Sequence, residues 1–298
     1  MSAGILIQNG NVIDGTGAEP ETGSVLIEAD VITAVGSKAD EKAREINDLK
    51  RIDATGQTVM PGLIDAHCHI TFDEPSSNDE LFFHRREGLA TLVAAYNVRK
   101  LLLAGVTSFF DADSIFEAGI DLRDAIEAGI VEGPRMSTGG NALMTSVGGT
   151  AGRLLPDEGR RGYGIITKTR DEIVAEVRRE IKSGVDWIKV HVTGLVPRRK
   201  EAGEVQVWTL DELRTVCDTA HDLGIPVVGH CRNASSTRDA ALAGFDMILH
   251  ATFMDDEALE IIVDKKVPVV PTFTFQANLA DYGDKVGADP GLMEIFRQ

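Results

Sequence analysis

Short apolar runs separated by glycine-rich turns characterise the first sixty residues of the chain. Runs of this kind, bounded by Asn, Gly and Asp, predict short strands joined by tight turns. The pattern predicts a small β domain over residues 1–60. The expected strands are 5–8, 12–13, 24–27 and 31–35, with turns at 9–10 and 15–17.

A repeating order of apolar strand, polar loop and amphipathic helix follows this first domain. Such alternation is typical of a parallel sheet built from βα units. Helices are expected over segments such as 85–104, 171–183 and 210–223, and Thr209 with Glu212 forms a capping-box pattern before the last of these. The seven expected strands are 63–69, 106–110, 135–138, 187–192, 226–230, 247–250 and 267–273.

The fold class that follows is α/β, with residues 61–298 forming a (β/α)8 TIM-like barrel domain. No glycine-rich GxGxxG turn follows the first strand, which disfavours an open doubly wound sheet. The chain ends at Gln298 within the expected helix after strand seven, so an eighth strand has no residues to form it. We expect a truncated form of a longer protein rather than a barrel closed by another chain. Residues 139–164 have little periodicity and are the expected active-site loop.

Composition narrows the class of protein. Hydrophobic residues make up 43% of the 298 residues and charged residues 26%, as in ordinary soluble enzymes. The net charge of −17 disfavours nucleic acid and anionic membranes as partners. The sequence has neither a long apolar run nor a secretory signal, so we expect a cytoplasmic protein. Its three cysteines form no CxxC pair, and we expect reduced thiols.

Four histidines stand at the ends of predicted barrel strands. His67 and His69 end the first strand, and residues at i and i+2 of a strand point to the same face. His230 and His250 end the fifth and sixth strands. The carboxyl ends of all barrel strands meet at one mouth, so the four imidazoles are expected to converge there as metal ligands.

Lys189 interrupts an otherwise apolar fourth strand. A lysine that faces the barrel interior is costly unless its charge is paired or removed. A neutral amine can add carbon dioxide and become a carbamate that bridges two metal ions, or it can form a Schiff base with substrate. The surrounding histidines favour the carbamate.

Three further polar residues lie near the strand ends. His191 shares the face of Lys189, where it either touches substrate or forms a hydrogen-bonded layer of the barrel. Asp111 and Asp113 end the second strand and are expected to be loop caps rather than ligands. The basic run at 198–200 offers a site for a substrate carboxylate, although a solvated loop is the simpler interpretation.

The sequence resembles the amidohydrolase superfamily, in the imidazolonepropionase-like and prolidase-like branch with a carboxylated lysine. The resemblance implies that His67 and His69 hold a buried metal and that the Lys189 carbamate bridges it to a second metal held by His230 and His250. Zinc suits the imidazole ligands, with manganese, cobalt or iron as alternatives. The motifs that carry the resemblance are PGLIDAHCH at 61–69, DWIKV at 186–190, PVVGHC at 226–231 and MILHAT at 247–252.

The resemblance also implies a domain organisation and further site residues. The small domain of the family is a β-sandwich built from both chain ends, so residues 1–60 are expected to form its N-terminal part. The family's strand-eight carboxylate would lie beyond Gln298, which leaves the catalytic acid unassigned. Asn141 and Trp208 stand where relatives carry a substrate-binding His and Tyr, so these two residues are expected to contact substrate.

Three functions remain open. The preferred one is metal-dependent hydrolysis of a C–N bond in an amide, carbamate, urea or small peptide, by a hydroxide that bridges two divalent ions. The second is a mononuclear deaminase or cyclic-ring hydrolase on the same barrel, and the third is an inactive fragment or scaffold. A metal content of two, one or no ions per chain would separate them. The expected partners are a small-molecule substrate and further copies of the chain in a homo-oligomer.

Overall fold

The computed structural model of the chain describes residues 4–73, 84–149, 155–158, 162–196, 203–286 and 293. The chain divides into two compact units, Met1–Leu63 and Ile64–Gln298. Each unit has a hydrophobic core of its own. The functional residues that the sequence singles out all belong to the second unit.

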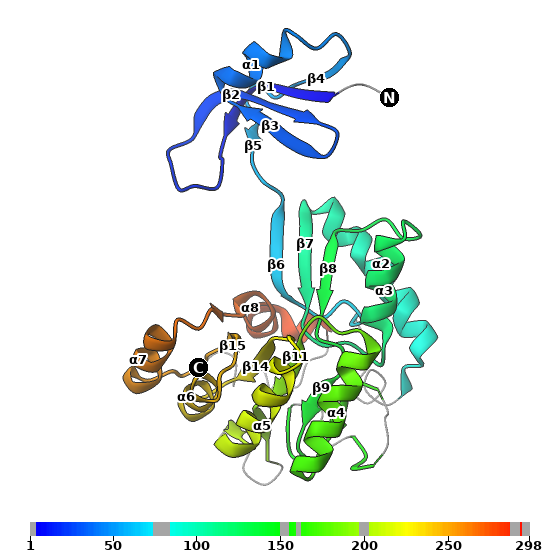
Figure 1. Ribbon diagram of the computed structural model, residues 1–298, viewed down its shortest axis with the longest axis vertical. Coiled ribbons are helices and arrows are strands. Elements are labelled where there is room, and N and C mark those ends of the chain that lie inside the picture. The colour runs from blue at the N-terminus through cyan, green and yellow to red at the C-terminus, as the bar shows by residue number, and fades with distance from the viewer. Residues whose placement is uncertain are drawn as a thin grey trace. The chain divides into compact units, whose positions relative to one another are not determined.

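The first unit is a five-stranded sheet covered by one helix (Figure 1). The strands pair in the order β3-β2-β1-β4, and β5 also pairs with β1. Leu6 and Leu26 from the sheet pack against Ala39 and Ala43 of the helix. The elements are β1 (Gly4–Val12), β2 (Glu21–Glu28), β3 (Val31–Val35), α1 (Ser37–Ala43), β4 (Leu49–Asp53) and β5 (Thr58–Val59).

The turn predicted at residues 9–10 is wrong. Asn9 has φ of 62°, and the register of β1 against β2 shifts between Ile7 and Gly10. These are the marks of a β-bulge, for which Asn and Gly are suited because they tolerate positive φ. The strand therefore continues to Val12 and pairs there with both β2 and β5.

The second unit is built around parallel strands. One set pairs in the order β6-β7-β8, and a second in the order β10-β9-β11-β14-β15-β16. A break at residues 139–141 separates β8 from β9, and the backbone of Thr138 still accepts hydrogen bonds from the segment that leads into β11. The strands are β6 (Leu63–Cys68), β7 (Val106–Asp111), β8 (Arg135–Thr138), β9 (Ala142–Met144), β10 (Gly164–Ile166), β11 (Ile188–His191), β14 (Val227–Cys231), β15 (Met247–His250) and β16 (Val269–Val270).

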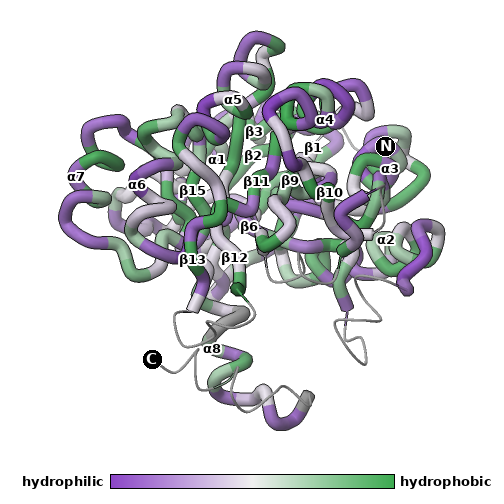
Figure 2. The backbone as a smooth tube through the Cα atoms, turned by 90° about the horizontal axis from the view of Figure 1, so that it is seen from below, coloured by the Kyte–Doolittle hydropathy of each residue, from purple (hydrophilic) through white to green (hydrophobic). Residues whose placement is uncertain are grey.

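Helices cover the strands of this unit on the outside (Figure 1). Contacts join α2 to β7, α3 to β8, α4 to β11, and both α5 and α6 to β14. Figure 2 shows hydrophilic and hydrophobic stretches alternating along the helices, as expected for amphipathic segments. The helices are α2 (Glu87–Leu103), α3 (Ala118–Glu127), α4 (Arg170–Ser183), α5 (Leu210–His221), α6 (Ala234–Ala243), α7 (Asp256–Lys265), α8 (Phe273–Tyr282) and the 3-10 helix η4 (Gly283–Val286).

The seven predicted barrel strands are all present, and the capping box of Thr209 with Glu212 is formed at the start of α5. Strand seven is shorter than predicted: β16 ends at Val270, and Phe273 already belongs to α8. Pro271 explains this, because proline has no N–H with which to continue the ladder. The predicted loop at 139–164 also contains the short strand β9.

The described strands do not close a barrel. Among the residues that the structure describes, β6 pairs with β7 alone and β16 with β15 alone. Ile64 on β6 is correspondingly 72% exposed. No described helix combines the length and the apolar character needed to cross a membrane. A hairpin of β12 (Thr193–Leu195) and β13 (Glu204–Gln206) follows β11.

Candidate active site

Four histidine rings lie together at the carboxyl ends of β6, β14 and β15. The ring centre of His67 is 5.2 Å from that of His69 and 5.0 Å from that of His250. His250 in turn lies 4.4 Å from His230. The structure thus brings together the four imidazoles that the sequence placed at one mouth of the barrel, because each follows or ends a parallel strand.

Lys189 lies fully buried on β11 and faces a buried carboxylate. Its Nζ is 2.9 Å from Asp113 Oδ2, the distance of an ion pair although the alignment is not that of a hydrogen bond. Burial alone would raise the pKa of Asp113, but Lys189 and His69 outweigh it and hold that pKa well below its usual value. The carboxylate is therefore ionised.

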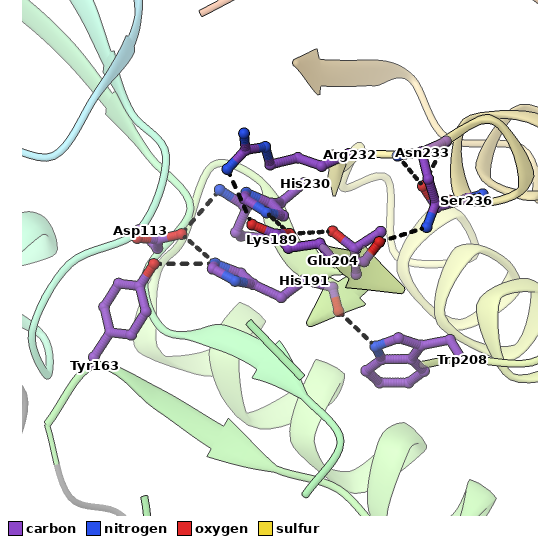
Figure 3. A network of polar contacts seen from close by, with 11 residues as sticks. Asp113, Tyr163, Lys189, His191, Glu204, Trp208, His230, Arg232, Asn233 and Ser236 are labelled. Atoms are coloured by element: carbon purple, nitrogen blue, oxygen red, sulfur yellow. Dashed lines mark hydrogen bonds and ion pairs between the residues drawn. The ribbon is translucent and has the colours of Figure 1, made fainter. Parts of the chain in front are cut away.

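Asp113 also contacts two histidines, as Figure 3 shows for one of them. Its Oδ1 lies 2.8 Å from His69 Nδ1, and its Oδ2 lies 3.0 Å from His191 Nε2. The expectation that Asp113 caps a loop is wrong, since it lies at the centre of a buried polar cluster. Asp111, by contrast, accepts a hydrogen bond from the backbone N–H of Ile70 and so ties the turn after β6 to the end of β7.

The three residues expected to contact substrate have different surroundings. His191 is 2% exposed, pairs with His230 across β11 and β14, and lies 3.1 Å from the Tyr163 hydroxyl. The indole N–H of Trp208 donates to the backbone oxygen of His191 at 2.7 Å. Asn141 lies at the break between β8 and β9, where its side chain donates to the oxygen of Phe116. Substrate contact by these residues stays a prediction.

Glu204 forms a second buried carboxylate on the other side of the histidines (Figure 3). Its Oε2 lies 2.7 Å from His230 Nε2 and accepts from the Thr193 hydroxyl at 2.6 Å. Its Oε1 accepts from Arg232 Nη1 at 3.1 Å. Burial would raise the pKa of Glu204, but His230, Arg232 and Thr193 together lower it to about 2. Glu204 is therefore ionised at neutral pH.

Sequence reasoning missed Asp113, Tyr163 and Glu204 as members of this cluster. A signal existed for Asp113, because Asp111-x-Asp113 repeats at a strand end the i, i+2 spacing of His67-x-His69. Glu204 lies in a short hairpin with no period of its own, so nothing in its neighbourhood marked it. The basic run at 198–200 lies outside the described residues.

Residues 58–287 match the model of the amidohydrolase family. The chain belongs to this family. The amidohydrolase is 26% identical over 288 residues to ochratoxinase of Aspergillus niger, a match that covers 90% of this chain and 58% of that protein. It is 26% identical over 246 residues to imidazolonepropionase of Paracoccus denitrificans, covering 79% of this chain and 60% of that protein. The chain thus spans about three fifths of the length of these curated relatives.

Solved structures show the same relationship. A Xaa-Pro dipeptidase with bound methionine in the active site matches this amidohydrolase with a TM-score of 0.80 and 26% identity, covering 99% of this chain and 73% of that chain. A prolidase complexed with N-methylphosphonate-L-proline matches with a TM-score of 0.82 and 25% identity, covering 99% and 72%. The superfamily resemblance inferred from the motifs is confirmed, and the neighbours imply a TIM-like barrel.

Two histidines of this amidohydrolase have the properties of metal ligands. Burial and the nearby charge of Lys189 lower the pKa of His67, and burial lowers that of His250, so both rings are neutral. Within the described part of the chain, His67 Nε2 and both ring nitrogens of His250 are buried without a hydrogen-bond partner. A buried nitrogen lone pair with no partner is the donor that a divalent metal requires.

The other two histidines of the cluster, His69 and His230, face carboxylates. His69 is turned to Asp113 and His230 to Glu204, and no group of three His, Cys, Asp or Glu in the described residues is already spaced around a metal ion. Metal-binding histidines commonly donate their second nitrogen to a carboxylate, which leaves the other nitrogen for the metal. The donor set therefore fits a divalent ion.

Proposed function

We propose that this amidohydrolase hydrolyses a C–N bond in an amide, carbamate, urea or small peptide with the help of divalent metal. The observation that carries the proposal is the cluster of His67, His69, His230 and His250 around buried Lys189 at the carboxyl ends of the strands. The curated relatives named above support a hydrolase of this kind. The substrate is a small molecule.

In this proposal His67 and His69 would hold one ion, and His230 and His250 would hold a second. Lys189, after its neutral amine adds carbon dioxide and releases a proton, would supply an anionic carbamate ligand and would no longer be a buried ammonium. A bound divalent ion supplies a Lewis acid and lowers the pKa of water to near neutrality. Zinc suits the imidazole-rich set best.

The residues of the chain orient the site. Asp113 holds His69 by Nδ1, so that Nε2 of that ring is left for the metal. The backbone oxygen of His191 is fixed by the indole of Trp208, which leaves the His191 ring aligned with Tyr163 and Asp113. His191, Asn141 and Trp208 are the residues that we propose to contact substrate.

One observation favours the alternative with a single metal ion. The 2.9 Å contact between Lys189 and Asp113 satisfies the lysine charge without a carbamate. A deaminase or cyclic-ring hydrolase with one ion would leave this pair intact. Two bound ions per chain therefore indicate the first function, and one ion indicates the second.

The test is the metal content of the chain after expression with zinc, manganese, cobalt or iron, together with amine release from N-acyl amino acids, dipeptides and ureas. We expect about two ions per chain and chelator-sensitive hydrolysis. His67→Ala and His250→Ala should each lose at least one ion. A chain that binds no metal, or binds it and cleaves no C–N bond, would overturn the proposal.

His221→Ala is the matched control. His221 lies on α5 and its Nε2 is 2.8 Å from Asp246, away from the histidine cluster. Removing this imidazole changes the histidine content by the same amount and should leave the metal content unchanged. Equal loss of metal in the control would show that the cluster is not the binding site.

A further inference from the structure

Glu204 is a buried carboxylate that the barrel strands do not supply. It lies on β13, its side chain is 5% exposed, and it pairs with Leu195 of β12 in the hairpin that follows β11. The backbone oxygen of Glu204 accepts from Asn233 Nδ2 at 3.0 Å, and Asn233 caps α6. Helix α6 and the hairpin therefore fix the position of this carboxylate.

The second anchor of the hairpin is Gln206. Its amide donates to Asp239 on α6 at 2.8 Å and to the backbone oxygen of Trp208 at 2.9 Å. These contacts attach β13 to α6 at two points, two residues apart. A carboxylate whose strand is anchored at two points can impose an orientation on a neighbouring ring.

Three groups lie within hydrogen-bond distance of the Glu204 carboxylate, and Figure 3 shows two of them, Arg232 and His230. Arg232 Nη1 lies 3.1 Å from Oε1, and the Thr193 hydroxyl and His230 Nε2 lie 2.6 and 2.7 Å from Oε2. An ionised carboxylate can only accept hydrogen bonds. His230 Nε2 must therefore carry a proton, and in the neutral ring the nitrogen left with a lone pair is Nδ1.

The His230 ring cannot easily escape this arrangement. One face stacks on His191, with the ring centres 4.8 Å apart and the planes 4° from parallel. His250 meets it edge-on with its centre at 4.4 Å. Packing against these two rings limits rotation of the His230 ring. The tautomer of His230 therefore decides which of its nitrogens has a lone pair for a metal ion.

We infer that Glu204 is a positioning residue that fixes His230 as the Nε2–H tautomer and makes Nδ1 its metal-binding nitrogen. The inference rests on the proposed function for the identity of the ligand that Nδ1 binds. The tautomer itself is a property of the metal-free chain. His230 differs in this respect from His250, because neither ring nitrogen of His250 has a hydrogen-bond partner in the described residues.

Glu204→Gln tests this without removing the side chain. The Gln oxygen should turn to Arg232, because a guanidinium has donors only, and the Gln NH2 then faces His230 and Thr193. His230 must accept from that NH2 through Nε2, so its proton moves to Nδ1. We expect the tautomer to reverse and metal affinity to fall about 10- to 100-fold.

The tautomer is read from two-bond 1H–15N correlations of metal-free protein with labelled histidine, and His230→Gln assigns the signal. Metal affinity is read by competition with a chelator. Thr193→Val is the matched control, because it removes one donor from the same Oε2 and leaves the carboxylate in place. It should keep the Nε2–H tautomer and hold metal within about threefold of wild type, well inside the 10- to 100-fold range.

Two results would overturn the inference. The first is an Nδ1–H tautomer for His230 in the wild-type chain. The second is a Glu204→Gln variant with unchanged tautomer and unchanged metal affinity. A wild-type chain that binds no metal would instead refute the proposed function, and the tautomer measurement would still decide the role of Glu204.

Discussion

Two buried carboxylates hold the histidine cluster from opposite sides, and their partners differ in kind. Asp113 lies between Lys189, His69 and His191, which are two possible metal ligands and one possible substrate contact. Glu204 contacts one proposed metal ligand, His230. Its other partners, Thr193 and Arg232, do not belong to the proposed ligand set. Asp113 therefore offsets the charge of Lys189 as well as orienting His69, whereas Glu204 contacts the proposed metal ligands only through the His230 ring.

This difference implies different behaviour when the site is loaded. A carbamate on Lys189 would set a second anion against Asp113, so their 2.9 Å contact has to open before the proposed two-metal site forms. The contacts of Glu204 can persist, because His230 keeps its Nε2 proton when Nδ1 binds a metal. We therefore expect the Asp113 side to rearrange and the Glu204 side to be preorganised.

Asp113→Ala should have the largest effect on the metal-free protein. It leaves the ammonium of Lys189, which is 0% exposed, without its carboxylate, and breaking a buried pair in this way costs about 3–5 kcal/mol. Urea denaturation of metal-free wild type and variant gives the difference in the free energy of unfolding. Adding Lys189→Met should recover most of the loss, because the uncompensated charge is then gone. A loss below about 1 kcal/mol, the scale of an exposed pair, would mean that water reaches Lys189.

Glu204 should make the next largest contribution to the free energy of unfolding, and this contribution should be lost on acidification. The pKa of Glu204 falls from an ordinary 4.5 to about 2 in the folded chain. Such a carboxylate contributes stability that is full above pH 4.5 and is lost as the pH falls toward 2, on the order of 3 kcal/mol.

The free energy of unfolding of metal-free protein, measured between pH 2 and 6, checks this. Glu204→Gln should flatten the slope below pH 4.5, since the amide does not titrate. Asp113 remains in that variant and keeps its own contribution of the same sign. An unchanged slope would show that other carboxylates dominate the acid response.

The backbone was more predictable than the site. The strands that carry His230 and His250 have continuous apolar runs, and the strand that carries His67 is apolar apart from Asp65. This pattern placed the four imidazoles at one end of a parallel sheet. Two boundaries were wrong for local reasons: the bulge at Asn9 keeps β1 extended, and Pro271 shortens β16. Neither error moved a histidine of the cluster.

The partners of these histidines could not be predicted, because they depend on contacts between distant segments. Asp113 and Lys189 are 76 positions apart, and the parallel arrangement of β7 and β11 alone does not show that their side chains meet. Glu204 reaches His230 from a three-residue strand whose position depends on its hairpin partner β12 and on contacts with α6. A carboxylate in such a segment looks like any solvated loop residue in the sequence.

Tyr163→Phe should change the free energy of unfolding least of these substitutions. It tests how much of the Asp113 side of the cluster depends on a neutral hydrogen bond. The Tyr163 hydroxyl lies 3.1 Å from His191 Nε2, and burial raises the pKa of this phenol well above its usual value, so the hydroxyl stays protonated. His191 keeps its 3.0 Å contact with Asp113 when the hydroxyl is removed, so we expect a loss of about 1 kcal/mol. Tyr96→Phe is the control, because Tyr96 is 68% exposed and should change the free energy of unfolding by less than about 0.5 kcal/mol. A loss of 3 kcal/mol or more for Tyr163→Phe, the range of a broken buried ion pair, would mean that the hydroxyl holds Asp113 itself in place.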